Sequence, residues 1–150
     1  MNAPKDKSLL LIAIGNSGRQ DDGLGWAFAD ALKDDDRFAA NIEYRYQLQV
    51  EDAELISCYD QVVFVDAYRG DRDITYEYQP CSAKGSFHFT THALDLESVL
   101  FLCREVYDHV PDAWQLAIKG YTWELETGLS GPARQNLEKA VAFFFSRKVT

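Results

Sequence analysis

Basic residues are scarce in this chain. Its 150 residues hold 15 Lys and Arg against 24 Asp and Glu, which gives a formal net charge of −9 at pH 7. Nucleic acids and anionic lipid surfaces are bound by clustered Lys and Arg side chains, which an acidic balance does not favour. We therefore expect no nucleic acid and no membrane among the partners. A metal site or a basic partner remains compatible with this charge.

Cysteines and long apolar segments are also scarce. The three cysteines form no CxxC pair, and an odd number without such pairs suits a reducing compartment better than a disulfide framework. A membrane span needs about 18 apolar residues. The apolar run Leu9–Ile14 is shorter and continues directly into Gly15, so it predicts a buried strand rather than a secretory signal. These features predict a cytoplasmic protein.

Apolar residues, in contrast, are plentiful. Hydrophobic residues make up 47% of the chain, and 9 Phe, 8 Tyr and 3 Trp supply large apolar side chains. A chain of this length buries roughly 68–70% of its unfolded surface, which is enough for one core without disulfides. We expect residues 1–150 to form a single domain that acts as a monomer.

Strand-like and helix-like segments alternate along the chain. Strands are predicted at residues 8–14, 42–48, 62–65, 74–78 and 114–118, and helices at residues 24–33, 51–59, 94–107 and 130–147. This alternation predicts an α/β three-layer sandwich, with a five-stranded, mostly parallel sheet and helices on both faces. Segment 74–78 follows the third strand too closely for a crossover helix, so it is the candidate for an antiparallel member.

The loop after the first strand is the first candidate for chemistry, because ligands of such sheets bind beyond the carboxyl ends of the strands. It runs Gly-Asn-Ser-Gly-Arg-Gln-Asp-Asp-Gly-Leu-Gly from Gly15 to Gly25. It lacks the endings of a P-loop and a dinucleotide-binding loop, and Arg19 stands where a nucleophile elbow needs Gly. What it offers is a carboxylate pair, Asp21 and Asp22, beside a helix start. Alternatively, one of these residues only caps the helix.

Two further segments bring chemistry to the same edge of the predicted sheet. Asp66 closes the apolar strand 62–65, where a carboxylate is costly unless it is paired, hydrogen-bonded or bound to a metal. Alternatively, it accepts backbone N–H groups in a turn. His92 precedes the long helix, where it could be structural and where Thr91 could be the cap. We treat His88 and His109 as incidental.

The three segments together predict a metal site. Two carboxylates from neighbouring strand ends and one imidazole form a facial set that leaves coordination positions open. Open positions are typical of a catalytic or substrate-borne metal, whereas structural zinc sites are closed. The sequence shows no Ser-His-Asp or Cys-His arrangement, so we expect no catalytic residue beyond the metal site.

In this order and spacing, the segments resemble the hydrogenase maturation endopeptidases. The resemblance runs from about residue 9 to residue 141. It is strongest at three motifs: Gly15-Asn16-x4-Asp21-Asp22-Gly23-x-Gly25, Val65-Asp66-Ala67 and Thr90-Thr91-His92-x-Leu94. A weaker match is Gly120-Tyr121-Thr122-Trp123-Glu124, which continues into Gly128-Leu129-Ser130.

The resemblance implies a fold and an activity. Members have an α/β fold with a five-stranded sheet, and they remove a short C-terminal extension from the large-subunit precursor of a nickel–iron hydrogenase after nickel insertion. The precursor carries the nickel, so the resemblance implies no organic cofactor. By motif position, three side chains would engage that nickel: Asp22, Asp66 and His92. A supporting loop would comprise Gly15, Asn16, Asp21, Gly23 and Gly25.

The chain also departs from the family pattern. The family often has Glu where Asp22 stands, and its Gly-Glu pair before Gly-Leu-Ser is Glu126-Thr127 here. The Pro-Gly often found after the strand-three Asp is replaced by Tyr68-Arg69-Gly70-Asp71. These departures put the identity of the precursor in question and leave the three proposed nickel ligands in place.

Two alternative functions stay open from the sequence. A signalling receiver domain would use an Asp pair, a phosphoacceptor, a Thr and a Lys, which could be Asp21-Asp22, Asp66, Thr90 or Thr91, and Lys119. Against it, the Asp pair stands six residues beyond Gly15, and no Pro follows Lys119. The second alternative is a non-catalytic relative that acts in hydrogenase assembly on the same scaffold.

Overall fold

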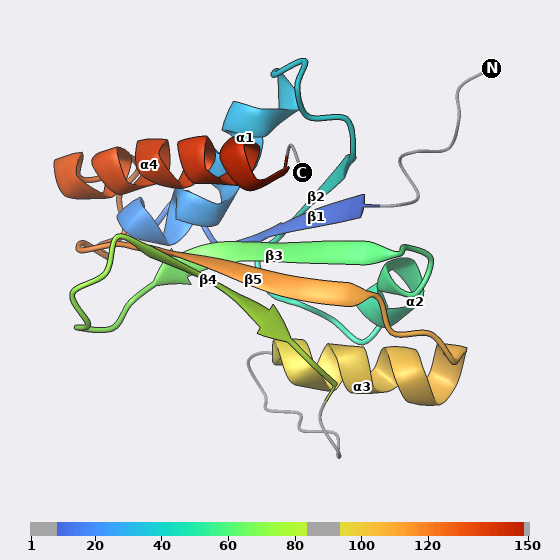
Figure 1. The fold of residues 1–150 in the computed structure, drawn as a ribbon. Helices are drawn as coiled ribbons and strands as arrows, with labels where there is room; N and C mark the ends of the chain where they lie inside the picture. Colours follow the sequence, from blue (N-terminus) through green and yellow to red (C-terminus); the bar gives the residue numbers. More distant parts are fainter. Residues whose placement is uncertain (1–8, 84–93, 149–150) are drawn as a thin grey trace.

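A computed structural model describes residues 9–83 and 94–148 and contains one five-stranded sheet (Figure 1). The strands are β1 (Leu9–Ile14), β2 (Asn41–Arg45), β3 (Gln61–Tyr68), β4 (Tyr76–Cys81) and β5 (Asp112–Lys119). The helices are α1 (Leu24–Lys33), α2 (Asp52–Ile56), α3 (Leu96–Tyr107) and α4 (Gly131–Lys148), and the short 3-10 helix η2 (Gln20–Gly23) precedes α1.

The sheet has the order β2-β1-β3-β5-β4. The pairs β1–β2, β1–β3 and β3–β5 are parallel, and β4 alone runs antiparallel to β5. This confirms the predicted mostly parallel sheet, and it confirms that the short connection after β3 leads to an antiparallel strand. Since the chain moves from β1 to one side and later to the other, the strand order reverses beside the carboxyl ends of β1 and β3. In α/β sheets such a point is where ligands bind.

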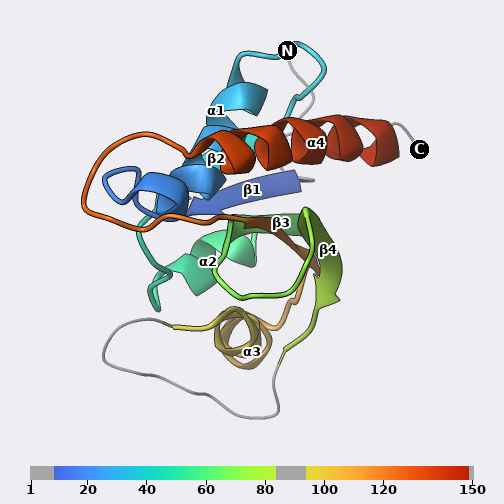
Figure 2. The same cartoon turned by 90° about the vertical axis from the view of Figure 1, so that its left-hand side faces the viewer.

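Two apolar layers cover the two faces of the sheet. Alternate residues of β1 and β3 point to opposite sides, as the period of a strand requires. Leu11, Val63 and Val65 belong to the layer under α1 and α4, whereas Leu10 and Phe64 belong to the layer against α2 and α3. Figure 2 shows the helices on both sides of the sheet, which confirms the predicted three-layer arrangement.

Two further features follow from these layers. None of the described helices is long and apolar enough to cross a membrane. All three cysteines are free: Cys58 is exposed, Cys81 is partly buried, and Cys103 is buried. The Cys103 thiol contacts the Ala53 carbonyl in the α2–α3 layer.

The structure corrects several predicted boundaries. Strand β3 does not end before Asp66 but continues to Tyr68, because Asp66 pairs with Ala117 of β5 in the parallel register. Helix α3 begins at Leu96, since the carboxylate of Asp95 accepts a hydrogen bond of 2.8 Å from the backbone N–H of Ser98. The prediction that Thr91 could cap this helix is therefore wrong.

Candidate functional site

The first turn of α1 packs directly against the carboxyl ends of β1 and β3. A Cβ atom on Gly25 would lie 2.5 Å from the carbonyl oxygen of Ile14 and 2.6 Å from that of Val65. Only glycine permits this approach, because both obstacles are backbone atoms of buried strands. The contact places η2, which carries Asp22, near Asp66, the residue that follows Val65 in β3.

Replacing Gly25 with Ala is expected to destabilise the protein by about 2 kcal/mol, the usual cost of forcing an extra methyl group into a packed site. Chemical denaturation at pH 7 measures the change. The matched control is Gly131→Ala, because a Cβ on Gly131 would meet no described atom within 4 Å. Equal stability of both variants would show that the approach of α1 to the strands is not tight.

The rest of the β1–α1 loop folds back on η2. Gly15 has a φ of +152°, and a Cβ there would lie 2.1 Å from the carbonyl oxygen of Asp22. That carbonyl accepts a hydrogen bond of 3.1 Å from the backbone N–H of Asn16. The side-chain oxygen of Asn16 in turn accepts from the backbone N–H of Gly18 at 2.8 Å. Gly23 lies against Ser17, where a Cβ would come within 2.8 Å of the Ser17 Cα. These contacts hold the loop that carries the carboxylate pair.

Asp21 is fully buried and fastens a second loop to the first. Its carboxylate accepts hydrogen bonds from the backbone N–H groups of Tyr121, Thr122 and Ser130, at 2.7, 3.0 and 2.8 Å, and from the Ser130 hydroxyl at 2.8 Å. Burial alone would raise the pKa of Asp21, but these donors outweigh it and lower that pKa below its usual value. The cap position of α1 is Gly23, which has no side-chain cap. The prediction that one Asp caps this helix is therefore wrong.

Backbone contacts extend this junction along residues 120–130. The N–H of Gln20 donates to the carbonyl of Glu126 at 2.8 Å, and the N–H of Asp21 donates to that of Thr122 at 3.0 Å. Gly120 lies so close that a Cβ there would come within 2.6 Å of the Asp21 Cβ. The segment that matched the family only weakly thus forms one side of the site.

Asp66 and Asp22 form a pair of carboxylates with few partners. Burial raises the pKa of Asp66 to about 7; the amide of Gln115 opposes the shift, and the charge of Asp22 adds to it. The Gln115 amide is weakly placed, at 3.4 and 3.5 Å from the two carboxylate oxygens. Burial also raises the pKa of Asp22, against the charges of Arg69 and Arg19. Within the described residues, neither carboxylate forms an ion pair.

Such a pair fits a divalent cation chemically. Two partly desolvated carboxylates, one of which raises the pKa of the other, gain from a positive charge between them. The third predicted ligand, His92, lies outside the described residues, as do Thr90, Thr91 and His88. Within the ranges that the structure describes, no three His, Cys, Asp or Glu side chains form a group that could hold a metal.

The alternative role of Asp66, an acceptor of backbone N–H groups in a turn, does not fit the structure. Asp66 lies within β3, and its hydrogen-bonding partner among the described residues is the side chain of Gln115. His109 has a structural contact, since its Nε2 lies 2.8 Å from the carbonyl oxygen of Tyr59.

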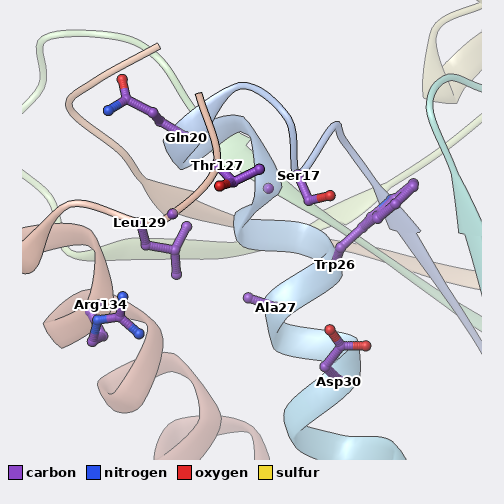
Figure 3. Close-up of a pocket in the computed structure, with 10 residues that line it drawn as sticks. Ser17, Gln20, Trp26, Ala27, Asp30, Thr127, Leu129 and Arg134 are labelled. Carbon is purple, nitrogen blue, oxygen red and sulfur yellow. The ribbon is translucent and has the colours of Figure 1, made fainter. Parts of the chain in front are cut away.

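A pocket of about 370 Å³ is lined in part by Gln20 and Gly23 of η2 (Figure 3). It lies between α1, the loop before α4 and the start of α4. The walls are apolar at Trp26 and Leu129, and the indole N–H of Trp26 donates to the Arg45 carbonyl at 3.1 Å. Asp30 and Arg134 supply opposite charges to the lining.

Solved structures match this architecture over nearly the whole chain. The hydrogenase maturating endopeptidase HybD from E. coli gives a TM-score of 0.72 at 17% identity, covering 91% of this chain and 89% of HybD. The NiFe hydrogenase maturation protease HycI from Thermococcus kodakarensis gives 0.69 at 22% identity, with 93% and 91% covered. A hydrogenase 2 maturation peptidase from a Thaumarchaeota archaeon gives 0.69 at 17%, with 94% and 97% covered.

The chain has the fold of the hydrogenase maturation endopeptidases. The predicted α/β class and the family resemblance in the sequence thus agree with the structural neighbours. No family model matches the chain, and no curated protein matches it. At these identities the likeness establishes the fold alone.

Within the maturation endopeptidase fold, the sequence motifs fall into two groups. Asp22 and Asp66 lie together at the reversal of strand order, and the glycines and Asn16 shape the loop around them. Asp21 belongs to the structural junction with Ser130, a role that the sequence does not reveal because the contact joins residues far apart in the chain.

Proposed function

We propose that this chain is an endopeptidase that removes a C-terminal extension from the nickel-loaded large-subunit precursor of a nickel–iron hydrogenase. The observation that carries the proposal is the Asp22–Asp66 pair at the reversal of strand order, within the fold of the maturation endopeptidases. Both carboxylates are partly buried, and neither is committed to an ion pair in the described residues. Such a pair suits an incoming cation better than a structural role.

In this proposal the nickel is part of the substrate. Asp22, Asp66 and His92 would bind it and thereby place the scissile bond of the precursor next to the pair. A bound metal ion can polarise a carbonyl or activate water. The residues of this chain would orient the precursor, and the loop held by Asp21 would form one wall around the peptide.

The test uses two forms of one precursor, the nickel-loaded and the nickel-free large subunit from the same organism. We expect mass spectrometry to show loss of a C-terminal peptide from the nickel-loaded form alone. Asp22→Ala should slow this cleavage at least about 100-fold, because it removes a proposed ligand of the substrate metal. Asp36→Ala is the matched control, since Asp36 is an exposed acid remote from the site.

The outcomes separate the alternatives. Cleavage of both precursor forms at one rate would contradict the role given to nickel. Cleavage of neither form, with the protein folded, would favour the non-catalytic relative that acts in hydrogenase assembly.

The receiver alternative is disfavoured by two described groups. Asp21 gives its carboxylate to the Tyr121, Thr122 and Ser130 donors, so it is not available to hold magnesium. The ammonium group of Lys119 donates to the carbonyl of Arg72 and lies 5.6 Å from the ring centre of Tyr121. Labelling of Asp66 by acetyl phosphate would revive this alternative.

A further inference from the structure

Trp123 lies on the side of the site that residues 120–130 form. It lies in the loop that Asp21 fastens through Tyr121 and Thr122. The indole packs over Gly120, where a Cβ would lie 2.8 Å from the ring atom Cη2. The absence of a side chain at Gly120 therefore makes room for the edge of the Trp123 ring at the start of the loop.

Two guanidinium groups from separate parts of the chain contact Trp123, one at its backbone carbonyl and one at its ring. Arg19, in the β1–α1 loop, donates from Nη1 to the carbonyl of Trp123 at 3.2 Å. Arg69, directly after β3, places its Cζ 4.7 Å from the centre of the Trp123 ring, within the range of a cation–π contact. Both side chains belong to exposed residues. We refer to Arg19 and Arg69 as the arginine pair.

The arginine pair lies close to the proposed nickel ligands. The charges of Arg69 and of Arg19 both act on the Asp22 carboxylate and oppose the rise in its pKa caused by burial. Arg69 also follows Asp66 by only three residues along the same strand end. A peptide bound at the Asp22–Asp66 pair would therefore lie near the arginine pair.

Most of the hydrogen-bonding capacity of the arginine pair is unused. A guanidinium has five N–H donors; Arg19 uses one in the described structure, and Arg69 uses none. Neither forms an ion pair with a described carboxylate. Other arginines of this acidic chain do pair with acids, in the pairs Arg37–Asp35, Arg45–Asp52, Arg72–Glu77 and Arg104–Glu105. Among the described residues of a chain with 24 acids, two cations that contact Trp123 and form no ion pair point to an acidic ligand from outside.

We propose that the arginine pair, held by Trp123, binds a carboxylate of the peptide that this chain cleaves. Arginine binds a carboxylate with two parallel N–H donors. The contact of Arg69 with the Trp123 ring leaves its N–H donors free at the edge of the guanidinium, and Arg19 keeps the donors that do not reach the Trp123 carbonyl. That this peptide is the C-terminal segment of the hydrogenase precursor rests on the proposed function. The carboxylate comes from an Asp or Glu side chain or from the C-terminus of that segment.

The binding step is tested by NMR titration of the full chain with three short peptides. The probes are acetyl-Gly-Glu-Gly amide, acetyl-Gly-Gln-Gly amide and acetyl-Gly-Gln-Gly with a free C-terminal carboxylate. We expect the indole signal of Trp123 and the Nε–H signals of the arginine pair to shift with a carboxylate peptide and to stay still with the Gln amide. A response to the Glu amide assigns a side-chain carboxylate, and a response to the free acid assigns the C-terminus. Equal responses to all three, or none, overturn the proposal.

The role in cleavage is tested with Arg19→Gln and Arg69→Gln, singly and together. We expect KM for the nickel-loaded precursor to rise about 10-fold for the double variant, with kcat within about twofold, because the pair binds substrate away from the metal. Arg69→Lys should recover part of the loss, since it restores the charge. Arg104→Gln is the control, an exposed arginine on α3.

These results keep the two proposals apart. Shifts with a carboxylate peptide but no cleavage of any precursor would contradict the endopeptidase and support the carboxylate site. Cleavage with an unchanged KM in the double variant would support the endopeptidase and contradict the carboxylate site. A loss of kcat equal to the loss caused by Asp22→Ala would show that the arginine pair acts on the metal ligands instead of on the peptide, which also overturns the proposal.

Discussion

Replacing Asp21 with Ala should destabilise the protein by about 4 kcal/mol at pH 7. The Asp21 carboxylate is fully buried and accepts from three backbone N–H groups and the Ser130 hydroxyl. Hydrogen bonds to a charged group contribute about 1.5–3 kcal/mol each, and donors left unsatisfied in the interior cost about 1–3 kcal/mol. The losses share one acceptor and do not add fully. Denaturant unfolding of both proteins measures the difference.

The Asp21→Asn variant separates the effect of the carboxylate as an acceptor from the effect of the side-chain volume. The amide keeps the size of the side chain but turns an NH₂ group toward one set of donors, so it should lose stability as well, by about 2 kcal/mol. Asp36→Ala is the control, because that side chain is exposed and should change stability by less than about 0.5 kcal/mol. If Asp21→Ala stayed within 1 kcal/mol of the parent protein, the junction with residues 121–130 would not be held by this carboxylate.

The pH dependence of this effect follows from the lowered pKa of Asp21. The folded protein holds the ionised carboxylate more strongly than the unfolded chain, whose value is about 3.8. The contribution of Asp21 is therefore complete above that pH and is lost as the pH falls through the lower value of the folded state. The stability gap between the parent protein and Asp21→Ala should shrink in this acid range.

The sequence predicts the scaffold well because strong local patterns determine it. The continuous apolar runs of β1 and β3 mark strands covered on both faces, and both occur where expected. Boundaries were less predictable, because partners remote in the chain set them. Asp66 belongs to a strand only because β5 extends far enough to pair with it. In the same way, Asp95 caps α3 by a local hydrogen bond that an apolar period does not reveal.

The candidate site could be predicted in part for a similar reason. A carboxylate that follows an apolar strand made Asp66 identifiable in the sequence, and the acid pair in the loop after the first strand did the same for Asp22. The division of labour between Asp21 and Asp22 was not, because it depends on Ser130, more than a hundred residues away. The sequence likewise places Arg19, Arg69 and Trp123 far apart, and only the fold brings them to one surface.

Opposite environments distinguish the acids of this site. Asp21 has a lowered pKa because it is surrounded by donors, whereas burial raises that of Asp66 to about 7. Neighbouring carboxylates with such divergent values are typical of functional sites, where one group supports the structure and another is kept ready for a ligand. Ionisation of Asp66 costs stability in the free protein, whereas the proposed function needs the ionised carboxylate. Stability and function should therefore conflict at this position.

Asp66→Asn should therefore remove activity and increase stability at the same time. The amide cannot act as an anionic ligand, so cleavage of a nickel-loaded precursor should fall by more than about 100-fold. The free protein should gain, because the parent binds a proton more tightly when folded, near pH 7, than when unfolded, near 3.8. Its stability consequently falls as the pH rises from about 4 to 7, and the amide removes this loss.

The measurement is denaturant unfolding of the parent protein and Asp66→Asn at several pH values from 4 to 8. The two stabilities should be nearly equal at pH 4, and the variant should lead by about 2 kcal/mol at pH 8, since a shift of one pKa unit corresponds to about 1.4 kcal/mol and partial exposure reduces the full effect. Asp112→Asn, an exposed acid at the start of β5, should leave the pH profile unchanged. A variant that cleaves the precursor at the parent rate would remove Asp66 from the proposed ligands. A pH profile parallel to that of the parent would instead show that Asp66 is ionised without cost, and that the Asp22–Asp66 pair is not held in readiness for a cation.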